Sequence, residues 1–398
     1  MQSGWRIGSI FGIPLYLDSS WFFILALFTL GYGSAWQSEG WGTLTTWAAG
    51  FVMTLLLFGS VLLHELGHSL IALSQGINVT SITLFLFGGV ASIDQESKTP
   101  GQAFQVAIAG PAVSLGLFVI LTLAHQFLPF SSLGSEIVKN LANINLILSL
   151  FNMIPGLPLD GGQVLKAGIW KATGSRLKGI RWAARVGQIL GWAAIIIGIS
   201  LYLVYFSLGL LWISLLGWFG VRNASAYQRV ADLQDAISQV EAADAMTQDF
   251  RVIDADLTLE EFADRYIIGD DKFSTYFAAS EGRYRGLVED TALQTIERSQ
   301  WKHDSLTRII QPLSDIPSVE ESTSLRDVID QLETKELRQI TVLSPAGAVA
   351  GLIDRGDIVR AIAQKMNVSI SESLIKRIKE DGAYPSELPL HELAKASL

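Results

Sequence analysis

The segment His64-Glu65-Leu66-Gly67-His68 places two histidines four residues apart, with a glutamate beside the first. On a helix, residues four apart lie on one face, so the two imidazoles would point the same way. Two histidines and one further ligand can hold Zn²⁺ with a position left open for water, and the glutamate can take that water's proton. The pattern predicts a hydrolytic zinc site.

The metal motif continues an apolar segment. No residue from Trp47 to Leu63 is charged, and about 20 apolar residues are enough to cross a bilayer as a helix. A hydrolytic metal site inside such a segment indicates a substrate that is cut within the membrane.

A second polar cluster, residues 152–162, also lies in apolar surroundings and contains Asp160. Ionisable groups at membrane depth are costly and are usually functional. Asp160 would complete a three-ligand set with His64 and His68, and the prolines and glycines around it would let the chain bend toward the metal. The alternative is a helix-terminating turn in which Asp160 is a cap.

Together these segments resemble the site-2 protease family of intramembrane zinc metalloproteases, peptidase family M50, in its sporulation-type subgroup. The family's signatures are HExxH and a later NxxPxxxxDG, and Asn152, Pro155, Asp160 and Gly161 fit the second without a gap. Three further segments resemble family elements: Gly110-Pro111-Ala112-Val113-Ser114, Phe87-Gly88-Gly89-Val90-Ala91 and Gly12-Ile13-Pro14. The resemblance covers roughly residues 5–222.

The resemblance implies a role for each residue. His64, His68 and Asp160 would ligate one zinc ion per chain. Glu65 would polarise the attacking water and later protonate the leaving amine. Asn152 would donate a hydrogen bond to the developing oxyanion, a contribution of several kcal/mol in enzymes of this kind.

Charge divides the chain into two parts. Residues 1–228 carry 10 Lys and Arg and 7 Asp and Glu. Because the whole chain has 29 Lys and Arg and 38 Asp and Glu, the remaining residues carry 19 and 31 of them. The mean hydropathy of +0.36 is high for a soluble enzyme. We therefore expect a membrane half followed by an acidic soluble half, whose charge argues against nucleic-acid binding. The absence of Cys excludes disulfides and thiolate ligands.

Hydropathy predicts membrane spans near 19–36, 48–73, 102–125 and 138–157. The apolar region 188–221 is either one long tilted helix or two short ones hinged near Ser207–Gly209, and the basic residues at both of its ends favour two by the positive-inside rule. Six spans place both termini, and the metal site's end of its helices, on the cytoplasmic side.

Two segments leave alternatives open. Residues 80–93 are rich in β-formers and too short to span, which indicates a re-entrant β element. This element is either a buried connector or a strand edge that pairs with an unwound substrate. Residues 163–186, where basic and apolar residues alternate, form either an amphipathic helix at the interface or a solvated basic loop.

The soluble half contains a weak internal repeat in which each unit reads as helix, two strands and helix. Residues 256–262 align with 322–328, and 284–288 with 349–353. The repeat resembles a tandem pair of cystathionine-β-synthase (CBS) domains over 240–370. We therefore expect a membrane domain at 1–222, a linker at 223–239 and a C-terminal tail at 371–398.

CBS pairs often bind adenine nucleotides and often dimerise, so the resemblance raises both as open hypotheses for this chain. The family's G-h-h-(S/T)-x-x-D pattern, whose last residue contacts ribose, is matched by Gly351 and Asp357 but has Asp354 at the hydroxyl position. The first unit, Gly286 to Ala292, lacks both the hydroxyl and the acid. One nucleotide site at Asp357 and a purely structural or docking module both remain open.

The sequence therefore predicts a polytopic α-helical membrane protein of about six spans with a re-entrant β element, followed by a soluble α/β CBS-pair module. The expected activity is zinc-dependent cleavage of single-span membrane proteins near the cytoplasmic face. Substrates would be an anti-sigma factor, a membrane-tethered regulator or a signal-peptide remnant. We expect a cell-membrane location with the CBS domains in the cytoplasm. The alternative hypotheses are a CBS-gated transporter or channel and a catalytically silent scaffold.

Overall fold

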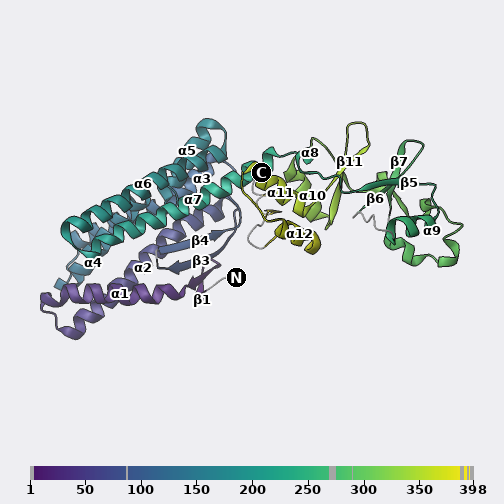
Figure 1. Cartoon of the computed structure of the whole chain (residues 1–398). Helices are drawn as coiled ribbons and strands as arrows, with labels where there is room; N and C mark the ends of the chain where they lie inside the picture. The colour runs from purple at the N-terminus through teal and green to yellow at the C-terminus, as the bar shows by residue number, and fades with distance from the viewer. Residues whose placement is uncertain are drawn as a thin grey trace. The chain divides into compact units, whose positions relative to one another are not determined.

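The computed structural model describes residues 4–86, 88–268, 275–288, 290–385, 390–391 and 394. Phe87, Glu289 and Pro389, which the sequence motifs and the tail include, lie outside the described residues. The chain forms two compact units, Met1–Ala231 and Asp232–Leu398 (Figure 1). Each unit is described by itself.

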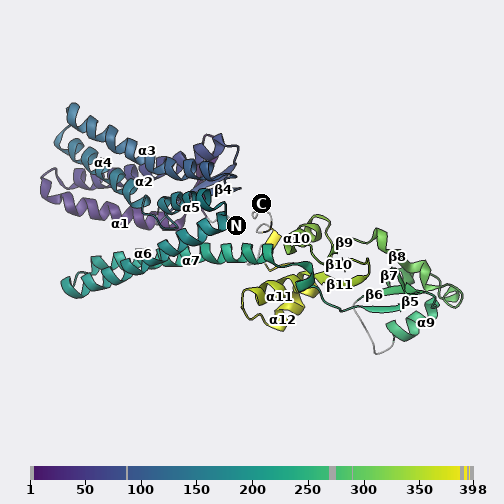
Figure 2. The same cartoon turned by 90° about the horizontal axis from the view of Figure 1, so that it is seen from above.

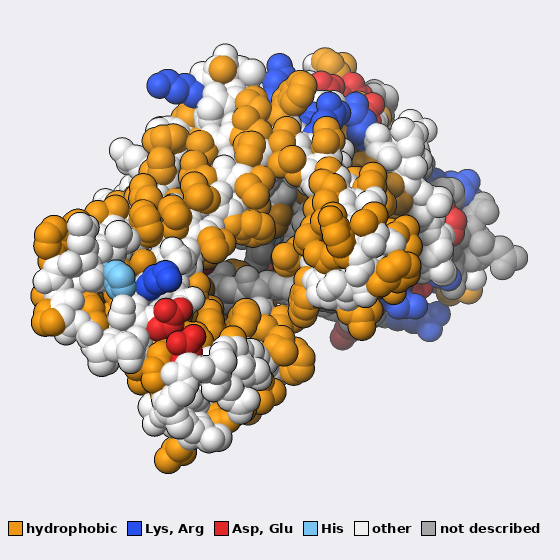
Figure 3. Space-filling view, turned by 90° about the vertical axis from the view of Figure 1, so that its left-hand side faces the viewer, with side chains coloured by type: hydrophobic (Ala, Val, Ile, Leu, Met, Phe, Trp, Pro, Cys, Tyr) orange, Lys and Arg blue, Asp and Glu red, His pale blue; other side chains and the backbone are white. Residues whose placement is uncertain are grey.

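The first unit is a bundle of long helices with a small sheet. The helices are α1 (Ser19–Ala35), α2 (Thr43–Ser74), α3 (Pro100–Phe127), α4 (Ser132–Asn152), α5 (Asp160–Thr173), α6 (Arg176–Tyr205) and α7 (Leu211–Gln239), with short 3₁₀ helices η1 (Trp36–Glu39) and η2 (Leu208–Leu210). By length and composition α2, α3 and α6 could each cross a membrane. Large apolar side chains such as Phe51, Ile120 and Ile196 are exposed on these helices, and apolar atoms cover much of the face in Figure 3. Such exposed apolar surface is suited to contact with lipid.

The apolar region 188–221 forms two helices, α6 and α7. The chain reverses at Phe206, whose φ of 50° is left-handed, and η2 covers the hinge expected near Ser207–Gly209. Ser214 of α7 donates a hydrogen bond to the carbonyl of Ile195 in α6, at 3.0 Å. The two helices lie side by side in both views (Figures 1 and 2).

The β element is larger than the sequence indicated. Strands β3 (Val79–Phe85) and β4 (Gly88–Ile93) form the hairpin expected over 80–93, and β1 (Trp5–Ile10) and β2 (Ile13–Leu17) extend it to a four-stranded sheet of order β1-β2-β3-β4. Both hairpins are antiparallel and β2 runs parallel to β3. Ile13 and Ile82 pack with Leu66 of α2. The sheet therefore lies against the helix that carries the metal motif, with β4 at its edge.

The basic segment 163–186 is helical, divided between α5 and α6 by a turn at Gly174. The structure therefore contradicts the solvated loop and agrees with the helical alternative for this segment.

The second unit contains two α/β lobes. The first has β5 (Arg251–Asp254), α9 (Leu259–Phe262) continued by the π-helix η3 (Ala263–Ile267), β6 (Tyr276–Ser280), β7 (Arg283–Val288) and β8 (Ile310–Pro312). The second has β9 (Ser318–Glu320), α10 (Leu325–Thr334), β10 (Gln339–Leu343), β11 (Val349–Asp354) and α11 (Arg355–Lys365). Around them lie α8 (Ala242–Ala245), α12 (Glu372–Asp381) and the 3₁₀ helices η4 (Asp290–Thr295), η5 (Arg298–Gln300), η6 (Leu306–Ile309) and η7 (Leu313–Asp315). The sheet orders are β5-β6-β7-β8 and β11-β10-β9.

Only the second repeat has the expected order of helix, two strands and helix. Its closing helix α11 begins with a capping box in which the Asp354 and Asp357 side chains bond each other's backbone N–H groups. In the first repeat the residue aligned with Asp357 is Ala292, which has no side-chain oxygen, and the chain forms short 3₁₀ helices there.

The unit boundaries differ from the sequence estimate at both ends of the soluble half. The boundary between the units falls after Ala231, inside α7, so the linker expected over 223–239 is helical. The segment expected as a tail contains α12, whose Ile375 and Ile378 are three residues apart and buried. Ile378, Leu390 and Ala394 belong to the core of the second lobe, because this apolar stripe needs a surface to cover it.

Candidate metal centre

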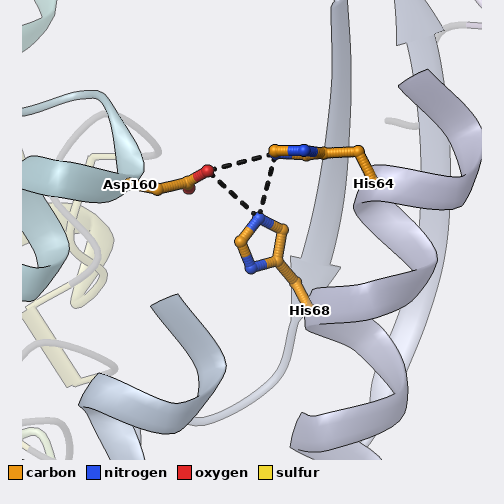
Figure 4. A group of neighbouring side chains, drawn as sticks. All are labelled: His64, His68 and Asp160. Carbon is orange, nitrogen blue, oxygen red and sulfur yellow. Dashed lines mark hydrogen bonds and ion pairs between the residues drawn. The ribbon is translucent and has the colours of Figure 1, made fainter. Parts of the chain in front are cut away.

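Three side chains from two helices converge on one point. His64 and His68 lie one turn apart on α2, and Asp160 is the first residue of α5. Figure 4 shows the two imidazoles and the carboxylate facing one another across the gap between the helices. The bend that precedes α5, over residues 153–159, brings Asp160 to this point.

The spacing of the three groups suits zinc. Asp160 Oδ2 lies 3.1 Å from His64 Nε2 and 3.3 Å from His68 Nε2. The two Nε2 atoms are 3.3 Å apart. A tetrahedral Zn²⁺ with bonds of about 2.0–2.1 Å separates its ligand atoms by roughly 3.3 Å. A set of two imidazoles and one carboxylate leaves the fourth position for water, so these residues fit a catalytic zinc ion.

Helix α3 orients both imidazoles from behind. His64 Nδ1 lies 2.9 Å from Ser114 Oγ, and His68 Nδ1 lies 2.7 Å from the carbonyl oxygen of Val106. Because a carbonyl only accepts, His68 carries its proton on Nδ1 and turns the lone pair of Nε2 toward the metal position. Ser114 was named above as part of a family-like segment, but no role was predicted for it. A hydroxyl shortly after Gly110-Pro111 in an otherwise apolar stretch was the available signal for one.

Gly110 lets α3 approach the site. A β-carbon at this position would lie 2.2 Å from His68 Nε2 and 2.7 Å from His64 Nε2. A side chain at position 110 would therefore occupy the place of the ligand atoms.

Glu65 lies beside the ligands in a cavity of about 330 Å³ that His68 and Asp160 also line. The edge strand β4 forms another wall through Ala91 and Ile93. A carboxylate placed next to the open ligand position can accept a proton from an attacking water. The structure thus brings Glu65, predicted as the base, together with the three predicted ligands.

Asn152 is placed differently. It is the last residue of α4, and its Nδ2 donates to the carbonyl oxygen of Leu148 in the same helix at 3.0 Å. The described residues that line the cavity do not include it. Its role toward an oxyanion stays a prediction.

Asp357 is 2% exposed, and its carboxylate is already paired. Oδ1 lies 2.7 Å from Lys379 Nζ of α12 and 3.0 Å from Arg360 Nη1. Burial raises the pKa of Asp357, against the opposing effect of Lys379. Lys379 and Arg360 thus already pair with this carboxylate, and a ribose contact at Asp357 stays a prediction.

Comparisons with known proteins agree with this chemistry. Residues 52–140 and 130–194 match peptidase family M50, and residues 308–364 match the CBS domain. The relative sll0528 of Synechocystis sp. is 42% identical over 366 residues, which cover 91% of this chain and 96% of the relative. Rip3 of Mycobacterium tuberculosis is 30% identical over 369 residues, which cover 91% and 93%. Both names assign these relatives provisionally as zinc metalloproteases.

A solved structure, the site-2 protease from Methanocaldococcus jannaschii, is 30% identical and aligns with 57% of this chain and 95% of its own, with a TM-score of 0.43. The family assignment rests on the near full-length relatives and on the metal-site residues. This chain belongs to peptidase family M50, the site-2 protease family, and is a zinc-dependent protease that carries a CBS domain in its C-terminal part.

Proposed function

We propose that the protein hydrolyses peptide bonds of membrane-spanning substrates, in regulated intramembrane proteolysis. The observation that carries the proposal is the three-ligand set of α2 and α5 beside Glu65, inside a bundle whose helices expose large apolar side chains. Because polar groups in such surroundings are costly, their convergence is best explained by catalysis.

The chain's own residues divide the reaction between them. When bound, zinc would lower the pKa of a water molecule and polarise the substrate carbonyl. Glu65 takes a proton from the attacking water and delivers it to the leaving amine. Asn152 stabilises the oxyanion, which requires its amide to leave the Leu148 carbonyl.

The substrate pairs with the free edge of β4 as an additional strand. Support comes from the strand order, in which β4 has no second neighbour among the described strands, and from its side chains Ala91 and Ile93, which line the metal cavity. An extended segment is also what hydrolysis needs, since a peptide bond inside an intact helix is shielded by its hydrogen bonds.

The topology that we propose has six spans, with α6 and α7 as a hairpin and the sheet re-entrant beside α2. The positive-inside rule then places the soluble unit, and the metal site's end of the helices, on the cytoplasmic side of the cell membrane. Support for two helices in 188–221 is the reversal at Phe206.

The proposed substrates are single-span membrane proteins, such as an anti-sigma factor, a membrane-tethered regulator or a signal-peptide remnant. We further propose that the CBS module modulates cleavage and that the chain can dimerise through it. Tyr227 lines the metal cavity from α7, and α7 runs on without a break to Gln239. Deleting residues 229–398 tests this regulation. An unchanged cleavage rate would count against it.

The activity is tested by reconstituting the protein in liposomes with a panel of tagged single-span membrane proteins. Wild type is compared with Glu65→Gln, and zinc is measured on both. We expect wild type to cut at least one panel member, and the variant to retain zinc and cut none. Cleavage that is the same in both would overturn the assignment of Glu65.

A further inference from the structure

An ion-pair cluster lies at the metal cavity, apart from the ligands and the base. Glu96, in the loop between β4 and α3, is 3.6 Å from Lys166 Nζ of α5 and 3.2 Å from Arg176 Nη1 at the start of α6. Glu96 and Lys166 both line the cavity that contains Glu65 and Asp160. Glu96 belongs to none of the motifs used above, and Lys166 and Arg176 belong to the basic segment 163–186, which was given no part in the metal site.

The two cations are built into the packed corner between α5 and α6. The side chains of Lys166 and Arg176 are only 12% and 17% exposed, whereas that of Glu96 is 48% exposed. Helix α6 closes on α5 at Gly179, where a β-carbon would lie 2.5 Å from the carbonyl oxygen of Lys166. Largely buried cations of this kind are costly without a counter-charge, so the loop carboxylate has a defined place.

The cluster connects two walls of the cavity. One wall is the face of α5 on which Asp160, Gln163, Lys166 and Trp170 recur at helical spacing. The other is β4, which continues directly into the loop that carries Glu96. The ion pair therefore joins the loop that follows β4 to α5, the helix that supplies the third metal ligand.

We propose that Glu96, Lys166 and Arg176 form a clamp that sets the separation between β4 and α5, and that these three are positioning residues for hydrolysis at the metal. The catalytic part rests on the proposed function, because it requires a substrate laid along β4. A small displacement of bound substrate from the metal is enough to slow a reaction strongly. The clamp prevents that displacement without touching the reacting atoms.

The first test needs no substrate. The chain has no Cys, so nitroxide labels can be placed at Ser92→Cys on β4 and Lys171→Cys on α5, both at exposed positions. Their distance distribution is measured in liposomes by pulsed electron paramagnetic resonance. We expect a narrow distribution that broadens in Glu96→Gln and in Lys166→Met.

The matched control is Asp94→Asn, an exposed carboxylate of the same loop that has no ion pair within the described part of the chain. It should leave the distribution narrow. Identical distributions in all four proteins would overturn the clamp.

The second test uses the panel member that wild type cleaves fastest. We expect Glu96→Gln to lower kcat about threefold to tenfold with zinc content unchanged, and the Glu96→Gln/Lys166→Met double variant to be no slower than the slower single variant, as residues acting as one unit behave. Additive losses, an unchanged kcat or a faster reaction would each contradict positioning by the clamp. If wild type cleaves nothing, the proposed function fails, and the label measurement still decides the clamp.

Discussion

The backbone of Gly89 lies directly against the side chain of Glu65. A β-carbon at position 89 would stand 2.5 Å from Glu65 Cγ and 3.2 Å from Oε1. The edge strand of the sheet and the predicted base are therefore in contact, although Gly89 and Glu65 are 24 positions apart in the sequence. A substrate strand added to β4 would arrive next to the base.

Gly89→Ala should consequently slow catalysis while leaving the metal in place. The added methyl group must push β4 or Glu65 aside, and a displacement of about 1 Å can cost about 100-fold in rate, so we expect kcat to fall roughly 10- to 100-fold. Cleavage kinetics and zinc content are measured together. Val90→Ala, which trims an exposed side chain of the same strand, is the control. A normal kcat in Gly89→Ala would show that the contact is dispensable.

Gly110→Ala should prevent zinc binding. The new β-carbon would occupy the space of both imidazole Nε2 atoms, and His64 and His68 could not keep their ligand positions. Zinc per chain is measured after purification, with helix content from circular dichroism as the check on folding. Gly116→Ala, in the same helix with open space around it, should bind zinc normally. A full zinc complement in Gly110→Ala would contradict the site geometry.

Ser114→Ala should weaken zinc binding without abolishing it. The hydroxyl lies 2.9 Å from His64 Nδ1 and holds the ring toward the metal position. Removal of such a partner typically costs about 10- to 100-fold in metal affinity, which competition with a chelator can measure. In Thr122→Ala the lost hydroxyl bonds only the carbonyl of Phe118 in its own helix, so that variant should match wild type. Equal zinc affinities of the two variants would show that Ser114 does not contribute to the metal site.

Because Lys379 is held in ion pairs, the soluble unit should lose stability when the pH becomes alkaline enough to neutralise this side chain. Burial disfavours its charge, but the ion pairs with Asp357 and Asp354 outweigh burial and raise its pKa above the ordinary 10.5. A folded-state pKa above the unfolded value gives a stabilisation that is complete below pH 10.5 and is lost as pH rises through the folded-state pKa.

Lys379→Met should therefore cost about 1–3 kcal/mol at neutral pH, because it leaves Asp357 buried without its amine partner. It should also flatten the loss of stability at alkaline pH. Calorimetric melting of the full chain from pH 7 to 11 measures both effects. The control Lys376→Met removes an exposed pair with Glu380 from the same helix and should change little. Equal melting of both variants at neutral pH would show that α12 does not depend on this pair.

The sequence was sufficient to predict which residues converge at the candidate metal site, because the signals for His64, Glu65, His68 and Asp160 are local. HExxH fixes two imidazoles and a carboxylate within one and a half helical turns, and Asp160 stands out as an ionisable residue in an apolar segment. The basic residues at both ends of the apolar region 188–221 likewise favoured the two helices α6 and α7 over one long helix, without excluding the latter.

The features that the sequence did not reveal depend on contacts between distant segments. Ser114 meets His64 across 50 positions, and β2 pairs with β3 only after a long helical crossover. Lys379 reaches Asp357 because Gly356 has no side chain in the way, a β-carbon there lying 2.6 Å from Lys379 Cγ. The residue pattern within one segment does not indicate which distant segment it will contact.

In the proposed reaction Glu65 transfers protons at a zinc ion held by His64, His68 and Asp160. The most direct test compares wild type and Glu65→Gln in liposomes, with cleavage of the single-span panel and zinc content read from the same preparations. We expect equal zinc content in the two proteins and cleavage by wild type alone. Undiminished cleavage by Glu65→Gln, or a folded wild type that binds no zinc, would contradict it.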